Sequence, residues 1–343
     1  MSESFLRRAL NGHVLDQEQA RSVFEEMSRG ELSEIEIAAF LGALHARGEQ
    51  PSEIAGAAEA FRSAAQHFTT TAPDVIDVVG TGGDGVGTIN ISTASAFVAA
   101  SMGLKVAKHG NRAVSSKAGA ADLVEAAGIP LDLSPASSAK LLERTGFCFL
   151  FAQKYHPAMR YVAPVRGALK NPTIFNLIGP LVNPAPLSYQ VLGVGKPELL
   201  DVVAKALASL GLKHALVVHG SGTDEFAVHG PTEIREITPE GIASFTVTPE
   251  ELGITPAPLS ELVGGDAEDN LRLISEIFAG KGAPAQQEAI AATSGAMLYL
   301  AGKAESLNQG TELALSQLSS GAVASHLDTI VSTARELKEQ EIQ

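Results

Sequence analysis

Apolar positions in the first 70 residues recur every three or four residues, as on one face of an amphipathic helix. The first predicted helix covers residues 17–28 and follows Asp16, a favourable N-terminal cap. The second follows Ser33 and Glu36, which have the spacing of a capping box. The third covers residues 51–65 and starts at a proline. Such short helices bury little apolar surface alone, so we expect them to pack on the rest of the chain or on a second subunit.

From residue 75 onward, short apolar runs alternate with stretches of helical periodicity. The predicted strands are 75–79, 104–107, 147–152, 189–193 and 215–219, and the predicted helices are 92–102, 119–127, 137–144, 196–210, 267–279 and 284–301. This alternation favours a mostly parallel sheet covered by helices. The predicted fold is therefore a small N-terminal all-helical domain followed by a larger α/β domain with a mostly parallel central sheet. Ligands of such sheets bind beyond the carboxyl ends of the strands.

Two segments interrupt these patterns. Residues 69–73 (TTTAP) read as a linker, and residues 155–186 carry six prolines, which is typical of a connector. We predict a helical domain over residues 1–70, joined by part of 155–186, and an α/β domain over residues 74–343. The hinges between the two are expected near residues 70–74 and within 155–186.

Composition narrows the classes of function. The net charge is −14, whereas proteins that coat nucleic acid or anionic membranes need a basic surface. The only cysteine, Cys148, lies in an apolar run, which excludes a disulfide framework and indicates a buried strand residue. The first ten residues lack a signal-peptide core, and no apolar run reaches the roughly 20 residues that span a bilayer. We therefore expect a cytoplasmic protein that binds neither nucleic acid nor membrane.

A glycine loop from Gly80 to Gly85 follows the first predicted strand. Its letters match the dinucleotide-binding fingerprint, but two features weigh against a nicotinamide enzyme. The next helix does not open at the third glycine, and the second strand ends in Lys108 and His109 rather than in the acidic residue that would bind a ribose. A glycine-rich turn without a ligand is the other alternative for this loop.

The chemistry that gathers at this sheet edge favours a phosphate ligand. Ser92 and Thr93 at a helix start can cap the helix, and the same hydroxyls and free N–H groups can bind phosphate oxygens. Lys108 is followed by Gly110, which permits close backbone approach, and by Asn111 and Arg112. Together these residues fit an anion clamp for a polyphosphorylated, sugar-containing ligand.

An adjacent carboxylate pair, Asp224 and Glu225, follows the strand at 215–219 within a glycine-containing loop. In isolation such a pair is as often a simple turn. At the ligand edge of a polyphosphate site it suits Mg²⁺, which commonly bridges a few carboxylates to substrate phosphates. The Ser92 hydroxyl is a candidate for a further ligand oxygen, and Asp84 could assist directly or through water.

These motifs resemble the anthranilate phosphoribosyltransferase family. The resemblance rests on Asp77-Val78-Val79-Gly80-Thr81-Gly82-Gly83-Asp84, Asn90-Ile91-Ser92-Thr93, Lys108-His109-Gly110-Asn111-Arg112-Ala113-Val114-Ser115-Ser116, His156-Pro157-Ala158-Met159-Arg160, Val165-Arg166, Thr173-Ile174-Phe175-Asn176, Gly179-Pro180-Leu181, Asn183-Pro184, Val218-His219-Gly220, Asp224-Glu225-Phe226 and Gly264-Gly265-Asp266-Ala267. The motifs span most of the chain in the family's order. One departure is Asn171-Pro172, where the family commonly has an arginine.

The resemblance implies an enzyme of tryptophan biosynthesis that uses Mg²⁺, 5-phosphoribosyl 1-diphosphate and anthranilate, and that forms a homodimer through its helical domains. It places around the phosphoribosyl diphosphate the residues Gly80, Gly83, Asp84, Thr88, Asn90, Ile91, Ser92, Thr93, Lys108, His109, Gly110, Asn111, Arg112, Ala113, Val114, Ser115, Ser116 and Ala120. Arg166 would meet the anthranilate carboxylate, and Asp224 and Glu225 would hold Mg²⁺. Lys108, His109 and Arg166 are the expected catalytic residues, with His109 either moving a proton or orienting the aminobenzoate.

Two further alternatives share parts of this pattern. A pyrimidine nucleoside phosphorylase would have a similar architecture and glycine loop, but its expected serine-rich signature and lysine pattern fit Lys108-His109-Gly110-Asn111 poorly. A non-enzymatic relative that binds nucleic acid would need a basic face, which the net charge of −14 disfavours.

Overall fold

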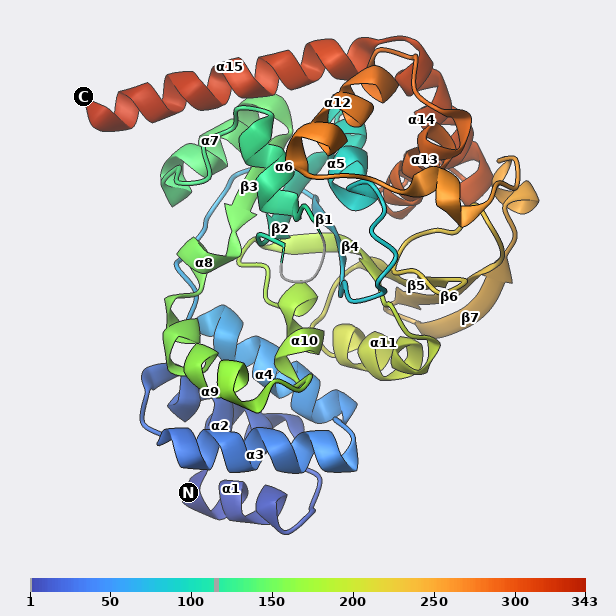
Figure 1. Ribbon diagram of the computed structural model, residues 1–343. Coiled ribbons are helices and arrows are strands. Elements are labelled where there is room, and N and C mark those ends of the chain that lie inside the picture. The colour runs from blue at the N-terminus through green and yellow to red at the C-terminus, as the bar shows by residue number, and fades with distance from the viewer. Residues whose placement is uncertain (1, 114–116) are drawn as a thin grey trace.

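The computed structural model describes residues 2–113 and 117–343. Its N-terminal part is a layer of four helices, drawn in blue in Figure 1: α1 (Ser2–Leu10), α2 (Gln17–Arg29), α3 (Glu34–Arg47) and α4 (Pro51–Ser63). The predicted caps are present: the Asp16 side chain accepts from the backbone N–H of Gln19, and Ser33 and Glu36 form a capping box. The three predicted helices are confirmed. Helix α1 was not predicted.

A seven-stranded sheet forms the centre of the larger part (Figure 1). Its strands are β1 (Val75–Gly80), β2 (Lys105–Gly110), β3 (Phe147–Phe151), β4 (Leu187–Gly193), β5 (His214–Gly220), β6 (Thr232–Thr238) and β7 (Gly241–Val247). They lie in the order β3-β2-β1-β4-β5-β6-β7. The first five are parallel and correspond to the five predicted strands, whereas β6 and β7 add an antiparallel hairpin that was not predicted.

Eight further helices cover this sheet: α5 (Ile91–Ser101), α6 (Ala120–Ala126), α7 (Pro135–Thr145), α11 (Leu200–Ala208), α12 (Ala267–Phe278), α13 (Pro284–Leu300), α14 (Leu307–Ser319) and α15 (Ala322–Ile342). Alternate residues of one strand serve different cores, as the two-residue period of a strand requires. Leu216 and Val218 join the core formed with α5 and α12–α15, whereas Ala215 and Val217 join the core that contains α11 and the N-terminal helices. Helices α14 and α15 were not predicted.

The proline-rich segment between β3 and β4 is folded and packs on the N-terminal helices. It contains α8 (Ala152–Tyr155), α9 (Ala163–Leu169), α10 (Phe175–Ile178) and two short 3₁₀ helices, Pro157–Tyr161 and Gly179–Leu181. Phe175 lies edge-on to Phe61 and Phe24, with ring centroids 5.0 and 6.1 Å apart. Aromatic edge-to-face pairs stabilise such contacts beyond simple burial. This segment therefore shares a core with the helices at the bottom of Figure 1.

Cys148 is buried in β3, as its apolar surroundings predicted. Within residues 2–113 and 117–343, no helix is both long and apolar enough to cross a membrane.

Candidate active site

The glycine loop after β1 is tied to the end of β4. The Thr81 N–H donates to the Gly193 carbonyl over 2.9 Å, and the Gly195 N–H donates to the Thr81 hydroxyl over 3.2 Å. Two glycines are required by close approach: a Cβ on Gly80 would collide with the Asp224 carboxylate, and one on Gly193 would collide with the Asp224 backbone carbonyl. The carboxyl ends of β1, β4 and β5 therefore meet at one point.

The carboxylate pair lies at this meeting point. Asp224 Oδ2 accepts from the Gly82 N–H over 2.6 Å, and Glu225 Oε1 accepts from the Ser92 N–H and hydroxyl over 3.1 and 2.5 Å. Burial, followed by the charge of Asp224, raises the pKa of Glu225 to about 8. Burial, followed by the charge of Asp84, raises the pKa of Asp224 to about 6. The structure thus brings together three carboxylates that repel one another and favour a cation.

This donor set fits Mg²⁺ in particular. The available ligands are hard carboxylate and hydroxyl oxygens, which Mg²⁺ prefers, and its remaining positions are usually filled by water and substrate phosphates. Among the described residues, no group of three or more His, Cys, Asp or Glu side chains is placed so that it could hold a metal ion by itself. A cation here would therefore depend on oxygens from a ligand. In this structure the Ser92 hydroxyl donates to Glu225, so Ser92 also fixes the position of that carboxylate.

Lys108 lies deeper than its position at a strand end suggested. Its side chain is only 2% exposed, and Nζ donates to the Val78 carbonyl over 2.8 Å. Burial lowers the pKa of Lys108, while the charges of Asp77, Glu225 and Asp224 act in the opposite direction. The lysine therefore supplies positive charge from beneath the glycine loop and beside the carboxylate pair.

Asp77 and Asn183 form a buried network that sequence reasoning did not assign. Asp77 Oδ1 accepts from the backbone N–H groups of Val78 and His109, and Oδ2 accepts from Asn183 Nδ2 over 2.8 Å. Burial raises the pKa of Asp77 to about 6. An aspartate in the middle of an apolar strand (VIDVV) was the available signal, because a buried charge has to be paired or hydrogen-bonded. Asp77 fixes the backbone at His109 and therefore the start of the loop after β2.

His109 is paired with a histidine from the proline-rich segment. Its Nε2 lies 3.1 Å from Nε2 of His156, and both rings are buried. Burial lowers the pKa of His156 to about 4 and that of His109 well below its usual value. Both rings are therefore neutral near pH 7, and one donates its N–H to the other. His156 belongs to one of the motifs of the resemblance, but the sequence alone indicates no role for it.

The loop after β2 is held mainly by acidic partners on its outer side. Arg112 pairs with Asp122 and Glu125 over 2.9 and 2.8 Å, and these hydrogen bonds raise the pKa of its guanidinium. The Ala113 N–H also donates to Asp122, and Ala120 packs against Gly110, where a Cβ would lie 3.0 Å from its methyl group. The predicted site residues Val114, Ser115 and Ser116 lie outside the described residues.

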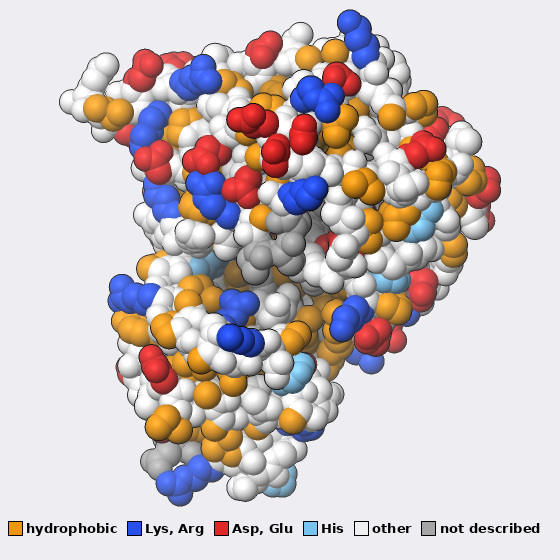
Figure 2. All heavy atoms as spheres, viewed as in Figure 1, with side chains coloured by type: hydrophobic (Ala, Val, Ile, Leu, Met, Phe, Trp, Pro, Cys, Tyr) orange, Lys and Arg blue, Asp and Glu red, His pale blue; other side chains and the backbone are white. Residues whose placement is uncertain are grey.

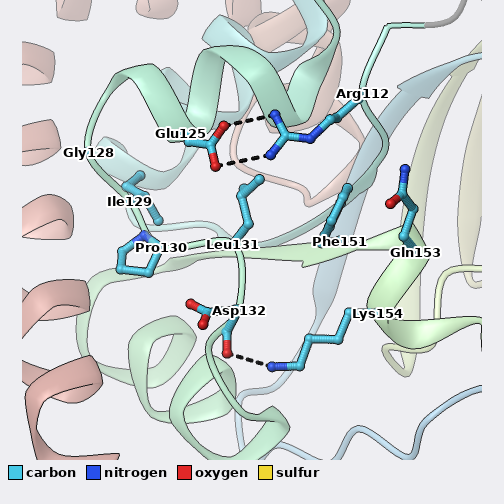
Figure 3. A pocket seen from close by; sticks show the side chains of 10 residues that line it. All are labelled: Arg112, Glu125, Gly128, Ile129, Pro130, Leu131, Asp132, Phe151, Gln153 and Lys154. Atoms are coloured by element: carbon cyan, nitrogen blue, oxygen red, sulfur yellow. Dashed lines mark hydrogen bonds and ion pairs between the residues drawn. The ribbon is translucent and has the colours of Figure 1, made fainter. Parts of the chain in front are cut away.

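A cavity of about 600 Å³ lies beside this loop (Figure 3). Arg112 and Glu125 face each other across its upper edge in the view, Lys154 points to the Asp132 backbone at the lower edge, and Leu131 and Phe151 lie between them. Both cationic side chains that line the cavity, Arg112 and Lys154, therefore already have protein acceptors. The cavity adjoins the candidate site through Gln153, whose Nε2 donates to Asn111 Oδ1 over 3.2 Å.

The start of α5 is fastened by a segment from the C-terminal third of the chain. Thr88 forms an isolated antiparallel bridge with Val263, and Asn90 Oδ1 accepts from Asn270 Nδ2 over 2.8 Å. Ile91 and Thr93 are buried in the first turn of the helix. The motif at 264–267 is visible in the sequence, but its contact with the start of α5 is not.

Arg166 lies on α9, across from the sheet edge. Its guanidinium lies over the Phe175 ring at 5.5 Å, and burial lowers its pKa. No carboxylate among the described residues forms an ion pair with it. Figure 2 shows a hollow between the helical part and the α/β part, with Lys and Arg side chains along its lower edge. A half-buried cation without an acidic partner is suited to binding an anion.

Comparisons with known proteins agree over nearly the whole chain. Residues 3–65 match the helical bundle domain of the glycosyl transferase family, and residues 72–324 match the α/β domain of that family. The anthranilate phosphoribosyltransferase of Idiomarina loihiensis is 48% identical over 322 residues, which is 94% of this chain and 96% of that protein.

Solved structures give the same result. The crystal structure of the enzyme of that name from Thermus thermophilus superimposes with a TM-score of 0.92 at 45% identity, covering 96% of this chain and 99% of the other. The yeast enzyme (Saccharomyces cerevisiae) in complex with phosphoribosyl diphosphate and Mg gives a TM-score of 0.89 at 26% identity, with 98% of both chains covered. With 4-fluoroanthranilate bound, the yeast enzyme gives 0.87 at 25% identity over 98% of both chains. The family predicted from the motifs is thereby confirmed: this chain belongs to the anthranilate phosphoribosyltransferase family of glycosyl transferases.

Proposed function

We propose that the protein transfers the phosphoribosyl group of 5-phosphoribosyl 1-diphosphate to the amine of anthranilate, releasing diphosphate. The observation that carries the proposal is the buried Asp224–Glu225 pair beside the glycine loop and Lys108. Carboxylates of this kind commonly hold Mg²⁺ together with substrate phosphates, so the site suits a magnesium diphosphate group. The yeast relatives with phosphoribosyl diphosphate, Mg and 4-fluoroanthranilate support the same assignment.

Asp224 and Glu225 would hold Mg²⁺, with the Ser92 hydroxyl close by as a further ligand oxygen. The glycine loop, the first turn of α5 and the loop after β2 surround the phosphoribosyl group, through the residues assigned from the resemblance. When bound, Mg²⁺ neutralises negative charge on the leaving diphosphate. Lys108 adds a fixed positive charge on the same side, so the electrostatic work is done by preorganised groups.

The attacking amine does not require a strong general base from the protein. The amine of an aminobenzoate is weakly basic and is already neutral at pH 7, so its lone pair is available without a strong general base. The lowered pKa of His109 makes it a poor proton acceptor. We therefore assign to His109 the orientation of the aminobenzoate, held in turn by its contact with His156.

Arg166 is assigned to the anthranilate carboxylate. Its guanidinium has no acidic partner among the described residues and lies on the helical side of the chain. Closure about hinges near residues 70–74 and within 155–186 would bring it toward the phosphoribosyl site and exclude water. Asn171 and Pro172, which replace the family's usual arginine, are exposed and follow α9, so this departure leaves Arg166 itself untouched.

A homodimer through the helical domain is also proposed. Helix α3 exposes a continuous apolar stripe of Ile35, Ala39, Gly42 and Ala46, and Ile35 is 82% exposed. Contiguous exposed apolar surface is a feature of protein–protein interaction sites. Ile35→Lys should shift the protein toward monomers in sedimentation velocity at micromolar concentration. An unchanged sedimentation coefficient would exclude this face.

The activity is tested by following the fluorescence of anthranilate. The signal should be lost only when phosphoribosyl diphosphate and Mg²⁺ are both present, and omission of either should preserve it. Thymidine or uridine with inorganic phosphate provides the matched test for a nucleoside phosphorylase. Release of free base in that assay, without loss of anthranilate in the first, would overturn the proposal.

A further inference from the structure

The segment that contains the motif at residues 264–267 contacts the end of the glycine loop and the start of α5. Residues 262–265 run antiparallel to residues 87–89: the Ile89 N–H donates to the Leu262 carbonyl over 2.9 Å, and the Gly264 N–H donates to the Gly87 carbonyl over 3.0 Å. We call residues 262–270 the strap. The strap fixes the end of the glycine loop just before α5 begins.

Asn270 is the point at which the strap meets the site. Its side chain is 1% exposed, its Oδ1 accepts from the Gly265 N–H, and its Nδ2 donates to Asn90 Oδ1, both over 2.8 Å. A Cβ on Gly264 would collide with the Asn270 amide oxygen, so the backbone approaches this side chain closely. The Asn270 amide is thus held in one orientation, with its donor facing Asn90.

The contact with Asn270 prevents the Asn90 side chain from capping the N-terminus of α5. Asn90 is the N-terminal cap of α5, yet its side chain makes no capping hydrogen bond. Its Oδ1 is occupied by Asn270, and its Nδ2 donates to the Ala118 carbonyl over 3.1 Å, which links it to the end of the loop after β2. The Ser92 N–H donates to Glu225 instead.

The consequence is a prepared set of donors. Asn270 holds the Asn90 oxygen and the Ala118 carbonyl takes one amide hydrogen, so the second amide hydrogen of Asn90 has no acceptor among the described residues. Within the same part of the chain, the Thr93 N–H has no side-chain capping partner. Both donors lie at the positive end of the α5 dipole, where phosphate oxygens are favoured. A free Asn90 would instead cap its own helix and compete with the ligand.

We propose that Asn270 is a positioning residue for phosphoribosyl diphosphate, which holds Asn90 away from the α5 cap and joins the glycine loop to the loop after β2. This inference rests on the proposed function and deepens it. Asn270 itself touches no substrate. Its effect should therefore fall on the binding of phosphoribosyl diphosphate and leave anthranilate binding almost unchanged.

The sharpest variant is Asn270→Asp. An aspartate still accepts from the Gly265 N–H but, when ionised, places an oxygen against Asn90 Oδ1. At a pH of about 8 the KM and Kd for phosphoribosyl diphosphate with Mg²⁺ should rise roughly tenfold, the cost of leaving one buried polar group unpaired. The KM for anthranilate should change less than about twofold. Glu268→Gln, an exposed change in the same turn of α12, is the control.

Lowering the pH provides a signature that a merely structural role would not give. A protonated aspartate can donate to Asn90, so the deficit of the Asp variant relative to the unchanged protein should shrink as the pH falls to about 5.5. The deficit of Asn270→Ala should not. A deficit that is equal for both substrates and insensitive to pH would overturn the positioning role.

A double-mutant cycle keeps the test decisive if the Asp variant fails to fold. Asn90→Ala and Asn270→Ala should be strongly non-additive in the Kd measured by calorimetry, because each removes the same interaction. Additive effects would refute the inference while leaving the proposed function intact, provided that the unchanged protein turns over. Failure of the unchanged protein to bind phosphoribosyl diphosphate would refute both.

Discussion

From the hydrogen bonds of the buried Asp77 carboxylate we predict how much stability the protein loses when this side chain is changed. Asp77→Asn keeps the size of the side chain but replaces one acceptor with a donor. If the amide oxygen stays with the N–H groups of Val78 and His109, the new NH₂ group faces Asn183 Nδ2, which is also a donor. One hydrogen bond is lost and two buried donors are forced together.

The magnitude follows from burial. Asp77 is fully buried and Asn183 is 1% exposed, so water cannot replace the lost acceptor. An unsatisfied buried donor costs about 1–3 kcal/mol. Lys108 also loses a compensating charge, although Asp224 and Glu225 remain near it. We expect a total loss of about 3 kcal/mol, and for a chain of 343 residues this lowers the melting temperature by roughly 4 °C.

The assay is thermal unfolding followed by far-ultraviolet circular dichroism, since the chain has no tryptophan. The exchanged pair, Asp77→Asn with Asn183→Asp, provides the control: the amide at 77 can donate to the carboxylate at 183, which still accepts from the Ala185 N–H. At the Ala107 carbonyl, however, a carboxylate oxygen replaces the donor, so this contact becomes unfavourable. Part of the lost stability should therefore return. If the two changes were simply additive, the network as described would be wrong.

Three further results are expected. Gly193→Ala drives a methyl group into the Asp224 backbone carbonyl and should lower the free energy of unfolding by about 2 kcal/mol, whereas Gly167→Ala, with nothing within 4 Å, should not; equal melting temperatures would contradict this packing. Arg166→Ala should raise the KM for anthranilate about tenfold and that for phosphoribosyl diphosphate far less, and equal effects would exclude a carboxylate-specific role. Protons compete with Mg²⁺ for Asp224 and Glu225, whose pKa values are raised to about 6 and about 8, so Mg²⁺ affinity should increase with pH over that interval and then level off. Glu225→Gln should remove the upper part of this increase in a Mg²⁺ titration, and an unchanged profile would count against the metal assignment.

Local patterns were sufficient for the elements whose burial is periodic. The five parallel strands and the helices capped by Asp16 and Ser33 were predicted because apolar spacing and capping chemistry act within a few residues. The β6–β7 hairpin was missed for the opposite reason. Strand β6 carries three charged residues, and most of β7 is exposed, so neither presents the apolar run of a core strand.

The sequence was sufficient to predict which segments meet at the sheet edge, but not which side chains pair with one another there. The glycine loop, Ser92 and the carboxylate pair meet as expected, because parallel strands place their following loops at one edge. Which partner each side chain takes depends on contacts distant in sequence. Arg112, which is predicted to lie at the ligand, pairs with Asp122 and Glu125 in this structure. The contact of Asn90 with Asn270 spans 180 residues. No local pattern encodes such pairings.

The position of the strap in the sequence also determines when the contacts of the site can form during synthesis. Strand β1 cannot complete its pairing until β4 has been synthesised, since Val75 lies beside Leu187. The contact of Asn90 with Asn270 can form only after the chain has been synthesised into its last quarter. Contacts this distant form late and slowly. A nascent or truncated chain that ends before the strap therefore has the glycine loop and the Asp224–Glu225 pair but lacks the contacts of Leu262, Gly264 and Asn270 that hold the start of α5.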